Sequence, residues 1–226
     1  MMNKDIILQI QQYFKGYHIV LWESSMIGRY SPYGDVDVYV IGKEKPNISL
    51  KIPGLILDIE FLDIEEIKLW NRNKISDLNR LKILYKILTG VHIQKIYDLY
   101  NVVNKESLLH YNQIYWSNVY VSLSEDIVKF EYAKNHEGNL FQIFYLIEAA
   151  EAIFLTKKGI FCIKRKWIHT DFLTNFLDIN YYEKNISTIL EHAKNKNFEK
   201  SVSVALKLGD YLRFYQELKG GERICE

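Results

Sequence analysis

Two aspartates separated by one residue, Asp35 and Asp37, occupy the segment 22–40 (WESSMIGRYSPYGDVDVYV), between a polar loop and an apolar run. Side chains at positions i and i+2 of a β-strand share a face, so both carboxylates would be aimed at one point. Carboxylates that close repel each other unless a proton or a cation lies between them. Mg²⁺ binds through one or two carboxylates together with substrate phosphates. The pair therefore predicts a magnesium site at a strand mouth that faces solvent and substrate.

A later apolar segment, 54–63 (GLILDIEFLD), offers two further acids, Asp58 and Glu60, on one face of a predicted strand. Adjacent strands lie about 4.8 Å apart, so an acid of this strand can share the metal. A third carboxylate would complete a two-metal arrangement for displacement at phosphorus. We favour Asp58 as the third ligand because Mg²⁺ demands near-ideal octahedral placement, which a short side chain fixes better. Glu60 is the alternative.

The loop before the aspartate pair has residues that suit a phosphate. Ser24 follows the apolar run 17–22, and Gly28 lies four residues later. Backbone amides and a hydroxyl in such a turn can hold a phosphate group. Together with the acids, this loop predicts metal-dependent transfer of a nucleotidyl or phosphoryl group.

With these residues the segment resembles the minimal nucleotidyltransferases of the polymerase-beta superfamily, which include antibiotic nucleotidyltransferases. Their signature is an apolar residue, Gly-Ser, a short loop with Arg-Gly, and Ser-Asp-x-Asp flanked by apolar residues. The matching positions here are the serine Ser24, the loop glycine Gly28, the metal-binding Asp35 and Asp37, and the third acid Asp58 or Glu60.

The sequence departs from this signature at three positions, where Glu23, Ile27 and Gly34 replace its glycine, arginine and serine. A glutamate at position 23 adds bulk and negative charge where the backbone of the family approaches a triphosphate. Arg29 is expected to restore a positive charge. A second register would use Ser25 as the signature serine and shorten the loop by one residue.

The resemblance implies an enzyme that moves a nucleoside monophosphate from a nucleoside triphosphate to a hydroxyl of a small, antibiotic-like acceptor, with Mg²⁺ and release of pyrophosphate. One alternative is a binding protein that keeps the fold and has lost the chemistry, for which Glu23 is the main support. Another is an antitoxin-type transferase that adenylylates a protein.

An α+β fold is needed to position these residues: a small mixed-sheet nucleotidyltransferase-like domain at 1–90 and an α-helical bundle at 91–226. Alternation and β-branched residues predict strands, and apolar spacing of three to four predicts helices. Nearly all of the chain from Ile93 to Leu218 has a helical pattern. The predicted strands span 17–22, 35–42 and 54–63, and the predicted helices begin near Ile6, at 63–73 and at 76–90, the last capped by Asp77 and ended by Gly90.

Two features of the helical half could serve the reaction. Glu148 and Glu151 lie among apolar residues of the predicted helix 138–159. Glu148 is our candidate for the base that deprotonates the acceptor, because burial raises a carboxyl pKa toward neutrality. The alternative is an ion pair with a lysine or arginine of a neighbouring helix.

A basic cluster precedes Trp167, and its Lys166 is a candidate for binding the triphosphate. The alternative is a solvated basic turn around a core tryptophan.

The overall charge excludes some partners. The 226 residues include 29 Lys and Arg against 28 Asp and Glu, a formal charge of +1, so nucleic acid is not expected as a partner. No apolar run approaches the ~20 residues needed to span a bilayer. The distant Cys162 and Cys225 suggest a reduced, cytoplasmic protein. The expected partners are a nucleoside triphosphate and a small hydroxylated acceptor, with a homodimer as a further option.

Overall fold

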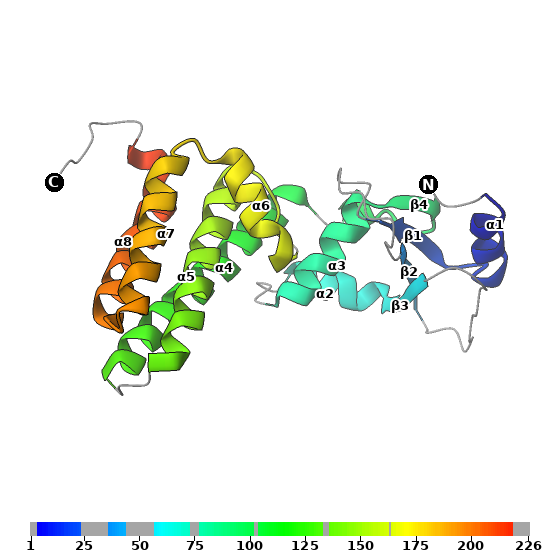
Figure 1. Ribbon diagram of the computed structural model, residues 1–226. Helices are drawn as coiled ribbons and strands as arrows, with labels where there is room; N and C mark the ends of the chain where they lie inside the picture. Colours follow the sequence, from blue (N-terminus) through cyan, green and yellow to red (C-terminus); the bar gives the residue numbers. More distant parts are fainter. Residues whose placement is uncertain are drawn as a thin grey trace. The chain divides into compact units, whose positions relative to one another are not determined.

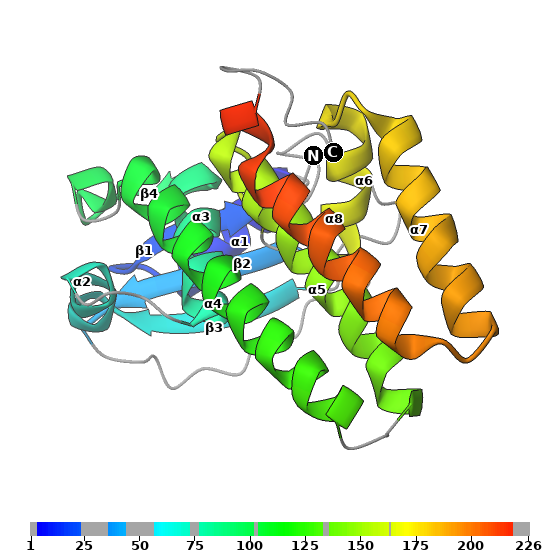
Figure 2. The same ribbon diagram turned by 90° about the vertical axis from the view of Figure 1, so that its left-hand side faces the viewer.

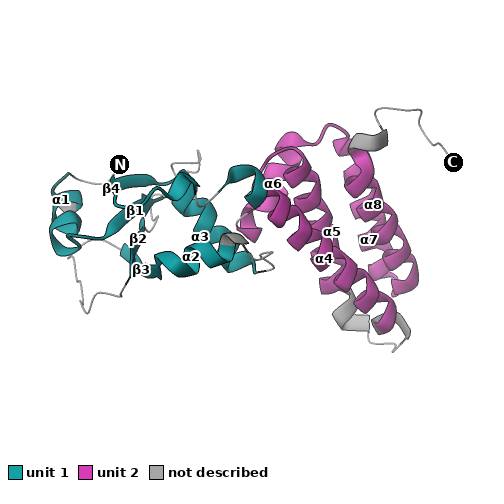
Figure 3. Cartoon of the chain, turned by 180° about the vertical axis from the view of Figure 1, so that it is seen from behind, with its two compact units in different colours: residues 1–108 teal, residues 109–226 magenta. Residues whose placement is uncertain are grey.

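The computed structural model describes residues 4–23, 36–43, 57–72, 77–101, 104–132, 136–162 and 164–218. The chain forms two compact units, Met1–Leu108 and Leu109–Glu226 (Figure 3). A four-stranded mixed sheet with helices is followed by a helical region, which confirms the predicted α+β fold (Figure 1). Within the described residues, no helix is both long and apolar enough to cross a membrane.

The first unit contains a sheet in the order β3-β2-β1-β4, in which β2 and β3 are parallel and β1 is antiparallel to both β2 and β4. One face of the sheet buries alternate apolar residues against Ile10 of α1 and Phe14, which directly follows that helix. Helices α2 and α3 lie on the opposite face (Figures 1 and 3). The elements of this unit are α1 (Lys4–Tyr13), β1 (His18–Trp22), β2 (Val36–Gly42), β3 (Leu57–Asp63), α2 (Ile64–Arg72), α3 (Leu78–Thr89), β4 (Val91–Gln94) and the 3-10 helix η2 (Leu99–Asn101).

The three predicted strands and the capped helix α3 are confirmed. The side chain of Asp77 accepts a hydrogen bond from the N–H of Asn79 at 2.8 Å, which satisfies one of the free donors at the start of α3. Gly90 follows the helix as predicted, with φ −77°, so no left-handed turn demands it. Glycine is required there because there is no room for a side chain: a Cβ on Gly90 would lie 2.6 Å from Cγ1 of Val20 and 2.7 Å from the carbonyl oxygen of Leu21.

The predicted start of the helical region near Ile93 is wrong, because β4 forms there instead. This strand pairs with β1, with Val20 opposite His92 and Leu21 opposite Val91. β-Branched Val91 and Ile93 suit an edge strand, but four residues are too few for a clear alternation. The compact units divide after Leu108, and the domain boundary placed at residue 90 stays a prediction.

The second unit is a bundle in which α5 contacts α6 and α8, and α7 contacts α8 (Figure 2). Its core includes an aromatic cluster around Phe154, Phe172 and Phe176, with the rings of Phe172 and Phe176 4.7 Å apart. The helices are α4 (Lys105–Tyr132), which begins in the first unit, α5 (His136–Lys157), α6 (Arg165–Asn175), α7 (Ile179–Lys194) and α8 (Phe198–Leu218).

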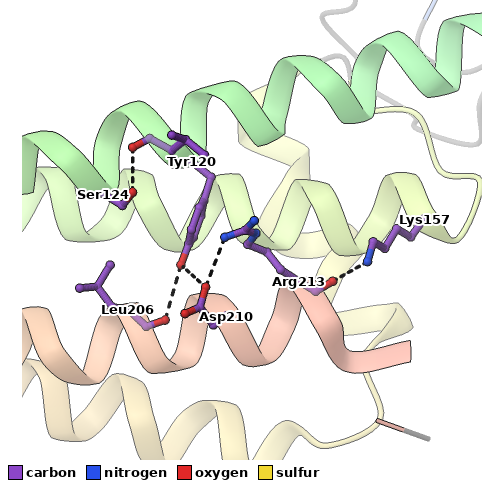
Figure 4. Close-up of polar contacts among 7 residues, drawn as sticks. Tyr120, Ser124, Lys157, Leu206, Asp210 and Arg213 are labelled. Atoms are coloured by element: carbon purple, nitrogen blue, oxygen red, sulfur yellow. Dashed lines mark hydrogen bonds and ion pairs between the residues drawn. The ribbon is translucent and has the colours of Figure 1, made fainter. Parts of the chain in front are cut away.

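Tyr120 links α4 to α8 through a hydrogen bond (Figure 4). Its hydroxyl donates to Oδ1 of Asp210 at 3.2 Å, and Arg213 donates to the same oxygen at 3.3 Å. The Nζ of Lys157, at the end of α5, donates to the carbonyl oxygen of Arg213 at 2.6 Å. A Cβ on Gly209 would lie 2.5 Å from the Tyr120 hydroxyl, so glycine permits this close approach of ring and helix.

Candidate functional site

Acidic side chains gather on the face of the sheet that α3 covers. The parallel register of β2 and β3 places Asp37 beside Asp58 and Tyr39 beside Glu60. Alternate residues of a strand share a face, so the three acids belong to one side of the sheet, as predicted. Asp58 and Glu60 are exposed, whereas Asp37 is buried, with 9% of its surface accessible. The expectation that Asp37 faces solvent is therefore wrong.

Lys86 of α3 explains why Asp37 can be buried. Its Nζ lies 2.8 Å from Oδ1 of Asp37, and each side chain is only 12% exposed. The same ammonium group lies 4.9 Å from the ring centre of Trp22, which is opposite Asp37 in the β1–β2 register. A buried carboxylate without a partner would cost several kcal/mol, at the order of magnitude known for such ions. Sequence reasoning missed Lys86, whose only signal is a lysine between the buried Leu84 and Ile87.

The pKa of Tyr39 reflects the negative charge on this face of the sheet. Its pKa is raised well above the usual range, first by burial and then by the charges of Asp37, Glu60 and Asp58. The hydroxyl therefore stays protonated and neutral at physiological pH, and the face gains no further negative charge from it.

The acids of the sheet fit a magnesium ion by residue type. Carboxylate oxygens are the ligands that Mg²⁺ prefers, and Asp37 and Asp58 supply them from adjacent strands. Within the described residues no group of three potential ligands is close enough to hold a metal ion. The predicted ligand Asp35 lies outside those residues. A cation at Asp37 also has to compete with the ammonium group of Lys86.

The predicted phosphate loop lies outside the described residues, so its roles stay predictions. Glu23 directly follows β1 and is half-buried. The loop residues concerned are Ser24, Ser25, Gly28 and Arg29, together with the two departures from the signature, Ile27 and Gly34.

The basic cluster surrounds Trp167 at the start of α6. The Nζ atoms of Lys164 and Lys166 lie 5.0 Å and 5.7 Å from the ring centre of Trp167. Lys166 is exposed, and Trp167 is half-buried. This arrangement agrees with a solvated basic turn, and binding of a triphosphate by Lys166 stays a prediction.

Glu148 of α5 forms a bidentate ion pair with Arg165 of α6. The Nε of Arg165 donates to Oε1 at 2.6 Å, and Nη2 donates to Oε2 at 2.8 Å. These hydrogen bonds raise the pKa of Arg165 further above its usual value. The guanidinium also stacks 4.1 Å above the ring of Tyr145. The ion pair that sequence reasoning weighed against a catalytic Glu148 is therefore formed.

Glu151, one turn farther along α5, is buried and has different partners. Its Oε1 accepts a hydrogen bond from Nδ1 of His169 at 2.9 Å and another from the Tyr182 hydroxyl at 2.5 Å. Because a carboxylate only accepts, the proton of a neutral His169 lies on Nδ1 and leaves Nε2 as an acceptor. The hydrogen bond to Glu151 raises the pKa of His169. Burial, then the charge of Glu151, raises the pKa of Tyr182 far above its usual value.

Sequence reasoning identified Glu151 but missed His169 and Tyr182, which lie 18 and 31 residues away and come from α6 and α7. No local pattern links positions so far apart in a helical bundle. Only the packing of α5 against α6 and of α7 against α8 brings the three together.

A cavity of about 570 Å³ opens between α5, α6 and α7, wholly within the second unit. Its polar lining consists of Glu148, Glu151, Arg165, His169, Tyr182, Glu183 and Ser187. Its apolar lining includes Phe144, Ile147, Leu173 and Ile186. The size is typical of sites for small molecules.

No protein-family model matches the sequence, and no curated protein matches it. Among solved structures, the fold is similar to a nucleotidyltransferase-like protein from Exiguobacterium sibiricum, with a TM-score of 0.52 and 12% sequence identity. The similarity covers 97% of this chain and 79% of that chain. At this identity the likeness concerns the fold alone, so the chain has a nucleotidyltransferase-like fold.

Proposed function

We propose that the protein transfers a nucleoside monophosphate from a nucleoside triphosphate to a hydroxyl of a small, antibiotic-like acceptor and releases pyrophosphate. The observation that carries this proposal is the pairing of Asp37 with Asp58 across parallel strands, in a chain with a nucleotidyltransferase-like fold. Two carboxylates on one face of a sheet suit a divalent cation that also binds phosphates.

In this proposal Asp35, Asp37 and Asp58 hold Mg²⁺, with Glu60 as the alternative to Asp58. Bound Mg²⁺ lowers the pKa of an attacking hydroxyl and neutralises charge on the departing pyrophosphate. The loop from Ser24 to Gly28 binds the phosphates.

Two further side chains have roles in this proposal. Lys166 adds positive charge for the triphosphate. Glu148 takes the proton of the acceptor hydroxyl, which requires its ion pair with Arg165 to open first.

Pyrophosphate release, measured with each nucleoside triphosphate, Mg²⁺ and a library of hydroxylated acceptors, tests the proposal. Asp58→Asn should lower turnover about 100-fold or more, at the scale of losing one preorganised electrostatic group. Glu66→Gln, which removes an exposed acid of α2, should leave turnover unchanged. A loss only in Glu60→Gln would assign the third ligand to Glu60. Full turnover in both Asp58→Asn and Glu60→Gln would contradict the site.

A second candidate function is binding without transfer, and the Lys86–Asp37 ion pair favours it. A chain that neutralises its own buried aspartate has less need of a metal at that position. Thermal unfolding with each nucleoside triphosphate, with and without Mg²⁺, separates the candidates, since a bound ligand raises stability by RT ln(1 + [L]/Kd). Stabilisation that requires Mg²⁺ supports the transferase, and no stabilisation by any nucleotide supports the binding protein.

A further inference from the structure

The cavity between α5, α6 and α7 is lined by charged and apolar side chains and contains none of the acids of the sheet. We propose that it binds a small organic cation, an amine or quaternary ammonium group attached to an apolar body. The proposal concerns the helical unit alone and stands whether or not the sheet transfers a nucleotidyl group.

The charge of the lining favours a cation. Three carboxylates, those of Glu148, Glu151 and Glu183, face one guanidinium, that of Arg165. With a neutral His169, the lining therefore carries two uncompensated negative charges. A concave site with an excess of one sign focuses its field and attracts ligands of opposite charge.

The cationic group of the lining is already paired with a carboxylate. Nε and Nη2 of Arg165 donate to Glu148, and Nδ1 of His169 donates to Glu151. An anion would have to break one of these charge-assisted hydrogen bonds, which are among the stronger polar interactions in proteins. Glu183, in contrast, is exposed and forms no ion pair with any other residue that the structure describes.

The apolar wall fits a ligand with a hydrocarbon or aromatic body. Phe144 and Leu173 are each 39% exposed although they are large apolar residues, and both line the cavity beside Ile147 and Ile186. An apolar ligand that covers this surface removes it from water, which favours binding. The ring of Phe144 can also attract an ammonium group through its π face.

His169 makes binding depend on pH. The groups around it are Glu151 from α5, Arg165 from its own helix, and Tyr182 and Glu183 from α7. Protonation of His169 adds a positive charge to the lining and opposes a cationic ligand. The affinity for a fixed cation should therefore rise as the pH rises through the pKa of His169, which its hydrogen bond to Glu151 raises.

The full chain can be tested with three probes that share one body and differ in charge: 4-phenylbutylamine, 4-phenylbutan-1-ol and 4-phenylbutyrate. Calorimetry and saturation-transfer NMR at low salt measure their binding. The amine should bind roughly tenfold more tightly than the alcohol, a difference of about 1.4 kcal/mol, and the carboxylate should bind most weakly. No binding of the amine, or equal affinity for amine and alcohol, overturns the proposal.

Matched variants assign the binding to this cavity. Glu183→Gln should weaken binding of the amine severalfold and leave binding of the alcohol unchanged. Glu191→Gln replaces an exposed acid of the same helix outside the cavity, and it should alter the affinity of neither probe. Ser187→Trp, at an exposed lining position, should fill the cavity and abolish binding of all three probes. Amine binding that persists in Ser187→Trp would overturn the assignment.

Two controls separate this site from the sheet and test its pH dependence. The trimethylammonium analogue of the amine keeps its charge at every pH, and its affinity should be severalfold higher at pH 8.5 than at pH 6. His169→Gln should remove that difference, and a difference that persists contradicts the role given to His169. Asp58→Asn should leave amine binding unchanged, and a loss of binding there overturns a site confined to the helical unit.

Discussion

Asp37 has a counter-ion of its own, the ammonium group of Lys86, in surroundings that exclude most of the water. In such a place an ion pair interacts more strongly than at the surface, and removing one partner leaves the other poorly solvated. Any cation that binds Asp37 has to displace Lys86 or share the carboxylate with it. Lys86 is therefore the residue that sets how readily this face of the sheet takes a metal ion.

Lys86→Met should increase the affinity for divalent cations about tenfold or more. Two like charges about 4 Å apart repel by ~4 kcal/mol at an effective dielectric of 20, and methionine removes that repulsion with little change in shape. Binding of Mn²⁺, as a substitute for Mg²⁺, can be measured by calorimetry and by electron paramagnetic resonance. Lys68→Met, which removes a lysine of α2 whose side chain is 40% exposed, is the matched control. Equal Mn²⁺ affinity in Lys86→Met and the wild type would show that Lys86 does not compete.

Asp37→Asn should destabilise the first unit by about 1–3 kcal/mol, because Lys86 would lose the charge that compensates its burial. Asp58→Asn removes an exposed carboxylate and should change the free energy of unfolding by less than about 0.5 kcal/mol. Urea unfolding followed by tryptophan fluorescence measures both. A larger loss in Asp58→Asn than in Asp37→Asn would contradict the burial argument. Asp58 is thus the cleaner position for an activity test.

At the scale of residues, the sequence was sufficient to predict that Asp58 and Glu60 share a face, because alternation within a strand is a local property. It was not sufficient to predict Lys86 beside Asp37 or His169 beside Glu151. Both partners arrive from other elements, and many lysines and histidines in helices have the same local pattern. The loop with Ser24 and Gly28 was recognised from its resemblance to a family and lies outside the described residues.

At the scale of elements, the position of the acids depends on the register between β2 and β3. A slip of one residue would turn Asp58 and Glu60 to the face packed against α1 and would turn the apolar Ile59 and Phe61 away from it. The alternation of each strand was readable from the sequence. Pairing partners and parallel direction were not, because they depend on contacts between distant segments. β4 was missed since Val91–Gln94 is too short to alternate visibly.

Gly90→Ala should destabilise the first unit by about 1–3 kcal/mol, the range typical of overpacking. An added Cβ would come within 3 Å of Val20 Cγ1 and of the backbone oxygens of Leu21 and Lys86, so β1 or the end of α3 has to move. The ordinary φ of Gly90 means that strain in the backbone contributes little. Urea unfolding measures the effect, and an unchanged free energy of unfolding would show that the close approach is relieved without cost.

At the scale of the whole molecule, each unit contains a histidine whose pKa is shifted, and the shifts have opposite signs. In the first unit, Nδ1 of His18 accepts from the backbone N–H groups of Ile96 and Tyr97, which places its proton on Nε2. That nitrogen lies 2.7 Å from Nδ1 of His92, whose Nε2 lies 3.0 Å from the carbonyl oxygen of Ile87. This chain of hydrogen bonds requires two neutral rings. Burial, with the charge of His92, lowers the pKa of His18 to about 4.

The sign of each effect on stability follows from the shift. An unfolded histidine binds a proton near pH 6.5, whereas folded His18 does so only near pH 4. The first unit therefore keeps the full contribution of His18 above pH 6.5 and loses it as the pH falls toward 4. In the second unit the pKa of His169 is raised by Glu151. Its contribution is complete below pH 6.5 and is lost as the pH rises through the folded pKa, and it is small because the side chain is 57% exposed.

Lowering the pH from 8 to 5 should therefore destabilise the first unit while α6 in the second unit becomes slightly better protected. A histidine that stays neutral in the folded state changes the free energy of unfolding by at most about 1.4 kcal/mol per pH unit below pH 6.5. Hydrogen exchange measured by mass spectrometry, corrected for the intrinsic exchange rate, reports on peptides of β1, β4 and α6 separately. His169→Gln should abolish the gain in protection of α6. His110→Gln removes an exposed histidine of α4 and should alter neither the loss of protection in the first unit nor the gain in α6. Equal loss of protection in both units at pH 5 would contradict the opposite shifts of His18 and His169.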